Sequence, residues 1–410
     1  MTAGKTIVGS WAKALRWAGV MGAAAVLAAC GGGGGGSAAA NGTLRVALTD
    51  APSCGYDHVF VTVEKVRVHQ SGSAGDSEGG WSEVAVSPAR RIDLLDLTNG
   101  VLEELGTTQL AAGHYSQIRL VLASNTGTGT SSVANAVQPT GGALIPLNTP
   151  SGQQSGLKLQ AHFDVAEGQT TDILLDFDAC KSIVKAGNSG NKYNLKPVLS
   201  VVPRVNTGIQ GFVTTTLSLS STTIAAQQDG VTIRSTAPDT TGKFSIPFLS
   251  TGTYTLVVMS DGRANAVVTG VPVGTSTTVV SGTSTAIVPP VSSMADVTGT
   301  VTLTSVSGGG TTTAPLTDAT VRALQTLTGG PTIELGNQAV DGDLGTYRFR
   351  LPVAAPVKAA FVTGSPLSFT TDSAVAGKYT MRAQAPGRAA QDKPADITSG
   401  SVNVDFNYGP

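Results

Sequence analysis

Acidic residues that could bind a cation occur in the segment LLDFDAC, residues 174–180. If this segment is a strand, a side-chain period of two places Asp176, Asp178 and Cys180 on one face. A disulfide from Cys180 to Cys54 would bring that face towards two further carboxylates, Asp50 and Asp57. Carboxylate oxygens are the ligands that calcium prefers, so the four aspartates together define a candidate calcium site.

The same carboxylates have a simpler interpretation, in which basic side chains neutralise them or they face water. We favour this interpretation and predict no metal site and no cofactor. The segment DGDLG, residues 341–345, also departs from the spacing of a helix–loop–helix calcium loop, and we interpret it as a turn. The cations available to the four aspartates are Arg45, Arg119, Lys181 and Lys196.

Catalytic motifs are absent from the sequence. It has no Gly-x-Ser-x-Gly elbow, no His-Glu-x-x-His and no phosphate-binding loop. The four histidines, at positions 58, 69, 114 and 162, are far apart in sequence, and a turn position accounts for His114 and a strand start for His58. We therefore predict that the chain is not an enzyme. The remaining alternative is a catalytic site assembled from segments that are distant in sequence.

The N-terminal segment has the pattern of an export signal. Lys5, Lys13 and Arg16 precede a short apolar run, residues 18–26, which is too short for a permanent membrane span. The run ends in Leu-Ala-Ala-Cys at 27–30, which resembles the lipobox of bacterial lipoproteins. The resemblance implies a signal peptide at 1–29 and a diacylglycerol- and palmitate-modified Cys30. The alternative is an ordinary secretory signal with a chance cysteine.

Six glycines follow Cys30 and would form a flexible tether, residues 30–42, between the lipid and the first folded domain. By family resemblance, Gly31 rather than aspartate after the cysteine favours the outer membrane, with a periplasmic or a surface-facing orientation left open. In an oxidising compartment, Cys54 and Cys180 are expected to form a disulfide. The alternative is two separate buried thiols.

The composition predicts an all-β protein of several domains. Only 13% of the 410 residues are charged and 5% are aromatic, whereas glycine alone occurs 51 times. Such a composition suits strands and turns. The net charge of −1, without a Lys/Arg cluster, excludes nucleic acid as a partner and leaves the lipid anchor as the means of membrane attachment.

Residues 43–205 form the first predicted domain. The alternation of valines slips by one near Glu64 and predicts a β-bulge. A helical turn is expected to end at Gly106, and residues 124–142 are expected to form a long loop. The segments LRVALTDAP, VFVTVEKVRVH, DLLDLTNG and LDFDACKSIV resemble the bacterial lipoprotein domain of unknown function 4382, which implies a β-rich fold and no established activity.

The remainder contains two related copies, at 206–282 and 294–410, joined by a Pro-containing linker at 283–293. Each copy begins with Gly-x-Val, at Gly211 and Gly299, and contains a turn closing on glycine before an aromatic residue. The second copy carries an insert of about 20 residues between two of its strands. The copies resemble prealbumin-like, carboxypeptidase regulatory-like modules, which implies β-sandwiches.

A Gly-x-Tyr motif occurs at Tyr115, Tyr254 and Tyr379. We expect each ring to be buried and its hydroxyl to bond backbone at a sandwich corner. The alternative is an exposed platform for sugar rings, to which Trp81 beside a Gly/Ser loop would add one ring.

These observations predict a non-catalytic, lipid-anchored cell-envelope protein that binds or displays an unidentified ligand, with a polysaccharide or an envelope protein as partner. A carbohydrate-binding accessory lipoprotein is the alternative function, and an enzyme is the third.

Overall fold

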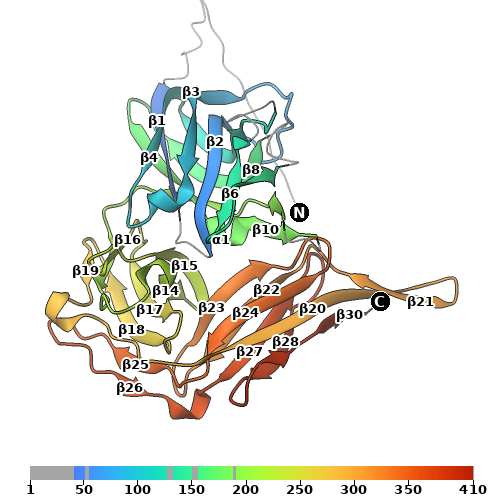
Figure 1. Ribbon diagram of the computed structural model, residues 1–410. Helices are drawn as coiled ribbons and strands as arrows, with labels where there is room; N and C mark the ends of the chain where they lie inside the picture. Colours follow the sequence, from blue (N-terminus) through green and yellow to red (C-terminus); the bar gives the residue numbers. More distant parts are fainter. Residues whose placement is uncertain (1–40, 51–54, 127–132, 150–155, 188–190, 410) are drawn as a thin grey trace, which may run out of the picture. The chain divides into compact units, whose positions relative to one another are not determined.

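The computed structural model describes residues 41–50, 55–126, 133–149, 156–187 and 191–409. This part of the chain is almost entirely β-structure, as the composition predicts (Figure 1). Its helical segments are single turns of three or four residues. Among the described residues, no helix has the length and apolar character needed to cross a membrane.

Two sheets with one shared core build the N-terminal part. The smaller sheet has the order β12 (Leu199–Pro203), β9 (Thr170–Phe177), β1 (Asn41–Asp50) and β4 (Glu103–Ala111). The larger has the order β10 (Ile183–Ala186), β11 (Lys192–Leu195), β7 (Ile145–Asn148), β6 (Ala136–Pro139), β2 (Tyr56–His69), β5 (Gly113–Leu122) and β8 (Leu157–Val165), with β3 (Ser82–Asp93) also paired to β2.

The slip of the valine period in β2 marks a real irregularity. Its pairing with both β3 and β5 shifts between Val63 and Lys65, which confirms the predicted bulge. Two local predictions were wrong. The helical turn, η1 (Leu94–Leu97), ends well before Gly106, which lies inside β4, and the expected loop at 124–142 contains β6.

The Asp178 and Cys180 side chains do not share a strand face with Asp176, contrary to prediction. Strand β9 ends at Phe177, and Asp178 caps the short helix α1 (Ala179–Ser182) by accepting a hydrogen bond from the Lys181 N–H, at 3.0 Å. An aspartate at this position satisfies a backbone donor that the first helical turn leaves open. The local capping interaction therefore replaces the period of two.

Two sheets also build the middle part, around a second core. One has the order β16 (Lys243–Pro247), β13 (Gly208–Phe212) and β19 (Thr278–Val279). The other has the order β15 (Val231–Thr236), β14 (Thr222–Gln228), β17 (Gly252–Ser260), β18 (Ala266–Val273), β25 (Val357–Ala360) and β26 (Thr370–Thr371). The short turn η3 (Leu219–Ser221) connects β13 to β14, and η4 (Thr283–Thr285) follows β19 on the way to the C-terminal part.

The C-terminal part encloses the third core. One sheet has the order β21 (Gly310–Pro315), β20 (Met294–Ser307) and β24 (Thr346–Pro352), with β29 (Val402–Asn403) and β30 (Phe406–Tyr408) also paired to β20. The other has the order β23 (Thr332–Ala339), β22 (Thr320–Thr326), β27 (Lys378–Gln384) and β28 (Gln391–Asp396). The turn η5 (Ser373–Val375) precedes β27.

The insert of the second copy joins the sheet of the first copy. Its strand β25 pairs in parallel with β18, from Ala266 opposite Val357 to Thr269 opposite Ala360. Phe361 and Phe369 of the insert pack against the core of the middle part. The linker residues 283–293 are also tied to this part, since Ile287 bridges Val213 and the Pro290 carbonyl accepts from the Ala264 N–H.

The shared motifs of the two copies have one physical explanation. Gly211 lies opposite Phe244, and Gly299 lies opposite Tyr347, in paired antiparallel strands. A Cβ atom at Gly211 would come 2.8 Å from the Phe244 ring, and one at Gly299 would come 2.8 Å from the Tyr347 ring. Each glycine therefore leaves the space that the opposite aromatic ring covers.

The three Gly-x-Tyr residues are buried, as predicted. The Tyr115 hydroxyl donates to the Ala111 carbonyl at 3.1 Å, and the Tyr254 hydroxyl donates to the Ser250 carbonyl at 2.9 Å. The Tyr379 hydroxyl donates to the Pro352 carbonyl. These rings are structural corner residues and offer no open platform for a sugar.

Candidate functional site

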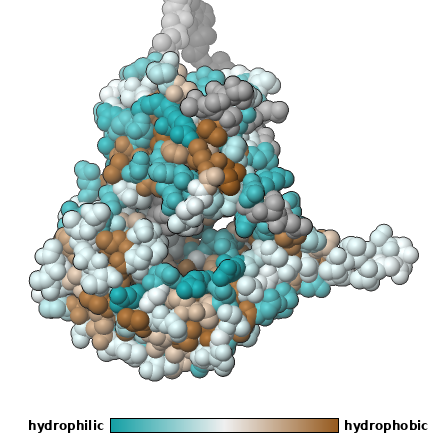
Figure 2. Space-filling view, in the orientation of Figure 1, coloured by the Kyte–Doolittle hydropathy of each residue, from teal (hydrophilic) through white to brown (hydrophobic). Residues whose placement is uncertain are grey.

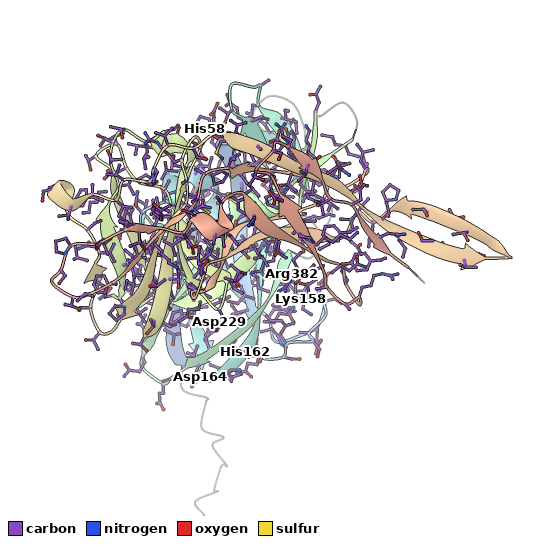
Figure 3. The ribbon with its side chains drawn as sticks, turned by 90° about the horizontal axis from the view of Figure 1, so that it is seen from below. His58, Lys158, His162, Asp164, Asp229 and Arg382 are labelled. Carbon is purple, nitrogen blue, oxygen red and sulfur yellow. The ribbon has the colours of Figure 1, made fainter. Side chains whose placement is uncertain are left out.

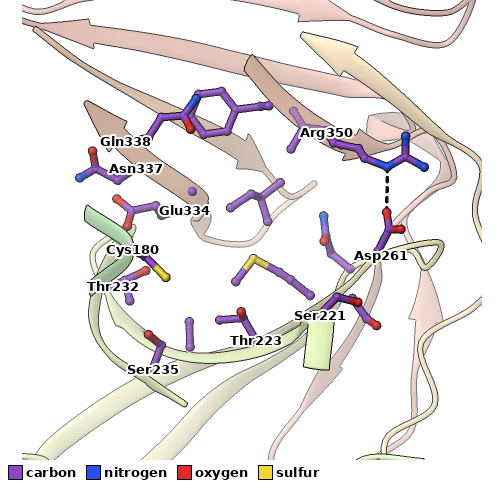
Figure 4. A pocket seen from close by; sticks show the side chains of 18 of the residues that line it. Cys180, Ser221, Thr223, Thr232, Ser235, Asp261, Glu334, Asn337, Gln338 and Arg350 are labelled. Atoms are coloured by element: carbon purple, nitrogen blue, oxygen red, sulfur yellow. Dashed lines mark hydrogen bonds and ion pairs between the residues drawn. The ribbon is translucent and has the colours of Figure 1, made fainter. Parts of the chain in front are cut away.

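A pocket of about 560 Å³, hereafter the junction pocket, is lined by residues from all three parts of the folded chain (Figure 4). Helix α1 contributes Cys180 and Lys181. Strands β14, β15 and β17 contribute hydroxyl groups and Met259, whereas β23 and β24 contribute Asn337 and Phe349. The pocket exists because the three parts contact one another through buried polar groups.

A buried ion pair joins the N-terminal and middle parts. Arg234 Nη1 of β15 lies 3.3 Å from Asp176 Oδ2 of β9, and the side chains are only 5% and 13% exposed. Burial raises the pKa of Asp176 and the neighbouring Asp178 raises it further, while Arg234 and Lys181 oppose the shift. The pKa of Asp176 stays raised overall, so the arginine offsets only part of the cost of desolvating the carboxylate.

Gln227 joins the middle and C-terminal parts. Its amide donates to the Glu334 carbonyl at 2.6 Å and accepts from the Glu334 N–H at 2.9 Å, so this side chain pairs with β23 as a strand would. Val257, Val267, Leu327 and Ile333 form an apolar cluster across the same contact. These contacts fix the wall of the junction pocket.

The charged groups around the pocket are paired within the chain. Arg350 Nε donates to Asp261 Oδ1 at 2.9 Å, as the dashed line in Figure 4 shows. The carboxylate of Glu334 pairs with Arg322. Lys181 Nζ lies 2.7 Å from Asp178 Oδ2. Burial by itself would lower the pKa of Lys181, but Asp178, Glu334 and Asp176 together raise it.

Neutral hydrogen-bonding groups remain for a ligand. Within the described residues, the side chains of Thr223, Ser235 and Asn337 line the pocket and make no hydrogen bond to the protein. Met259 and Phe349 add apolar surface beside them. Such a lining fits a neutral ligand that carries several hydroxyl or amide groups and one apolar face.

The four predicted aspartates do not form one site among the described residues. Asp176 and Asp178 are neutralised by Arg234 and Lys181, and Asp57 Oδ2 accepts from the Gly141 N–H at 2.9 Å. The Asp50 side chain lies outside the described residues. In the described ranges, no group of three or more His, Cys, Asp or Glu side chains is placed to hold a metal ion.

Of the four cations named from the sequence, Lys181 forms an ion pair with one of these aspartates, Asp178. Arg45 pairs with Asp172, Arg119 pairs with Asp76, and Lys196 donates to the Thr317 carbonyl. Sequence reasoning missed Arg234, because it lies in a different domain and is brought to Asp176 only by the packing of the two parts.

The DGDLG segment is a turn, as predicted. Asp341 Oδ1 accepts from the N–H groups of Asp343 and Leu344, both at 2.9 Å. In the first copy, Asp239 Oδ1 accepts from the Thr241 and Lys243 N–H groups in the equivalent turn. These bonds orient the carboxylates towards their own backbone.

The predicted cysteine chemistry falls largely outside the described residues. Cys30, the signal peptide and Cys54 all lie there. Cys180 is disulfide-bonded, but its partner sulfur is not described. The pairing of Cys54 with Cys180 and the lipid on Cys30 therefore stay predictions.

Two histidines that are far apart in sequence lie together. Pairing of β5 with β8 places His114 Nδ1 2.8 Å from Asp164 Oδ1 and His162 Nδ1 3.5 Å from His114 Nε2, all at the surface. Figure 3 shows His162 and Asp164 of this cluster. The alternation of His162 and Asp164 on one strand was the only signal of this cluster in the sequence. His58 pairs separately with Asp93.

Trp81 is already engaged within the chain. Its indole N–H donates to the Gly75 carbonyl at 2.9 Å, and the guanidinium groups of Arg67 and Arg119 lie 4.5 and 4.7 Å from its ring centroid. These contacts compete with a sugar for the same ring surface.

Comparison with known proteins assigns the first part of the chain. Residues 41–197 match the family model described as "Domain of unknown function (DUF4382)", and further β-sandwich domains follow this domain. The match confirms the DUF4382 resemblance read from the sequence. No curated protein matches the chain.

Several solved structures show a distant likeness to this chain. The Bacillus anthracis TIE protein is 12% identical over 90% of this chain, with a TM-score of 0.17, and this chain spans about half (50%) of its length. GBS52, the minor pilin of Streptococcus agalactiae, is 14% identical over 55% of this chain and 90% of its own, with a TM-score of 0.18. The pilus adhesin SpaC from Lactobacillus rhamnosus GG is 10% identical over 90% of this chain and 43% of its own, with a TM-score of 0.15.

Proposed function

We propose that this chain is a non-catalytic, lipid-anchored protein of the outer membrane that binds a neutral, hydroxyl-rich ligand in the junction pocket. The observation that carries the binding role is the pairing of the charges around the pocket, beside neutral groups without protein partners. The Leu-Ala-Ala-Cys sequence at 27–30 supports the anchor. The prealbumin-like identity of the two sandwiches, with boundaries at 206–282 and 294–410, is part of the same proposal.

A neutral sugar is the ligand class that this lining fits best. Hydroxyl and amide groups recognise sugar hydroxyls, and Phe349 with Met259 offers apolar surface for a ring face. An anionic or cationic ligand would have to compete with existing ion pairs, such as Arg350–Asp261. A carbohydrate-binding role is therefore the more specific form of the proposal.

The anchor is tested by replacing its sulfur. We expect intact-mass analysis of the chain from its native host to show a mature N-terminus at Cys30 that carries acyl chains. Cys30→Ser should lack this mass and leave the membrane fraction, since acyl burial supplies about 0.8 kcal/mol per methylene. Cys54→Ser is the matched control and should keep the lipid. An unmodified chain that begins at another residue contradicts the anchor without affecting the pocket.

The ligand site is tested by removing neutral hydrogen-bonding groups from the pocket. We expect Thr223→Val combined with Asn337→Leu to weaken binding of a neutral oligosaccharide, found by glycan array and measured by calorimetry, by about tenfold or more. Each lost hydrogen bond contributes about 1 kcal/mol, and 1.4 kcal/mol corresponds to a factor of ten.

Trp81→Ala is the comparison variant for that experiment, because Trp81 is the alternative sugar contact. Its affinity should equal that of the unmodified chain. Loss of binding only in Trp81→Ala would show that the sugar binds at Trp81 and not in the junction pocket. A glycan array without any signal would reject a carbohydrate ligand.

A further inference from the structure

A two-stranded arm extends from the C-terminal part. It consists of the end of β20 and β21, residues 304–315, and β21 stands clear of the other strands in Figure 1. Residues 305–315 are all exposed, with Val306 at 60%. The arm therefore has no core of its own.

The sequence of the arm specifies a hairpin. Gly308 and Gly309 adopt φ values of +59° and +82°, which suit the two-residue turn that joins twisted antiparallel strands. The register runs from Ser307 opposite Gly310 to Thr302 opposite Pro315. Threonine and valine favour extended backbone, but an isolated two-stranded hairpin is only marginally stable in water. A partner strand would stabilise it.

The outer edge of β21 is unprotected. Within the described part of the chain, strand β21 pairs with β20 alone, and the sequence has no charged residue between Asp296 and Asp318. The arm is accordingly near-white, intermediate in hydropathy, in Figure 2. By contrast, the edge strand β28 carries Asp392, Lys393 and Pro394, which are the residue types that block edge pairing.

The orientation of the free backbone groups follows from Pro315. Proline has no backbone N–H, so Pro315, which lies opposite Thr302, cannot donate a hydrogen bond to β20. Backbone groups alternate in direction along an antiparallel strand. Thr311 and Thr313, four and two residues earlier, therefore direct their N–H and C=O groups towards the open edge.

We infer that β21 pairs with β21 of a second copy of this chain, in antiparallel orientation about a two-fold axis at Thr312. In this register, the backbone N–H and C=O of Thr311 form hydrogen bonds with the backbone of Thr313 in the second copy. By symmetry, Thr313 forms the same two bonds with Thr311 of the second copy. An uncharged strand meets its own copy without repulsion, and Thr–Thr cross-strand pairs are favourable. The same patch serves both copies, as a closed two-fold interface requires.

The interface is small, so the association should be weak and should be measured over a wide concentration range. We expect sedimentation velocity of the full chain in detergent to show a monomer–dimer equilibrium. Thr313→Pro removes one outward donor and should weaken the dimer by about tenfold or more, a change of about 1.4 kcal/mol. Thr313→Val keeps the donor and the strand, and should retain the dimer.

Cysteine cross-linking tests the register independently of arm stability. Thr312→Cys should form a covalent dimer under mild oxidation, because the two copies of residue 312 face each other. Ser305→Cys is the matched control, since Ser305 is the β20 partner of Thr312 and lies one strand away from the interface. A chain that stays monomeric throughout, equal dimerisation of Thr313→Pro and Thr313→Val, or equal cross-linking at 305 and 312 would overturn the inference.

Discussion

Arg234→Met is expected to lower the free energy of unfolding by about 3–5 kcal/mol, because it leaves Asp176 buried without its counter-charge. Replacing both partners, as Asp176→Leu with Arg234→Met, should recover most of this loss, since an apolar pair of similar volume avoids the desolvation penalty. Urea unfolding of the single and double variants measures both values. Arg45→Met is the control, because its pair with Asp172 is substantially exposed, and its cost should stay below about 1 kcal/mol.

The loss in free energy of unfolding caused by Arg234→Met should also depend on pH. The pKa of Asp176 is already raised by burial, and loss of the arginine raises it further. A carboxyl group with a raised folded-state pKa contributes stability at low pH that is lost as the pH rises through that pKa. The variant should therefore be closer to the unmodified chain at pH 5 than at pH 8. An equal loss of unfolding free energy at pH 5 and pH 8 would mean that Asp176 does not become protonated in the variant.

Features encoded by neighbouring residues could be predicted from the sequence. The bulge in β2 appears as a slipped valine period, and the turns at Asp239 and Asp341 appear as acidic residues just before a closing glycine. The buried tyrosines follow from the Gly-x-Tyr spacing. In most of these cases the interacting groups lie within a few residues of one another, whereas the Tyr379 hydroxyl bonds the distant Pro352 carbonyl.

Features that depend on packing between distant segments could not be predicted. Nothing in the sequence around Val357 indicates that β25 pairs with β18 of the other copy. The Arg234–Asp176 pair and the junction pocket arise from the same kind of long-range contact. The error at Asp178 has the opposite cause, because a local helix cap ended a strand that the alternating pattern extended.

Gly299→Val is expected to destabilise the C-terminal part by about 3 kcal/mol, the upper end of the usual cost of overpacking. A Cβ atom at this position would lie 2.0 Å from the Val404 carbonyl oxygen and 2.8 Å from the Tyr347 ring. Neither group can move away freely, because the Tyr347 hydroxyl donates to that same carbonyl. The strand pairing of β20 with β24 would have to shift to admit the side chain.

The measurement for Gly299→Val is the thermal unfolding midpoint of the full chain, with Gly274→Val as the control. A Cβ atom at Gly274 meets nothing within 4 Å, so this variant should lie within about 0.5 kcal/mol of the unmodified chain. If both variants unfold at the same temperature, the glycine is not required for contact with the aromatic ring. If only Gly299→Val is destabilised, the Gly-x-Val motif marks the position that each sandwich leaves open for the aromatic ring of its neighbouring strand.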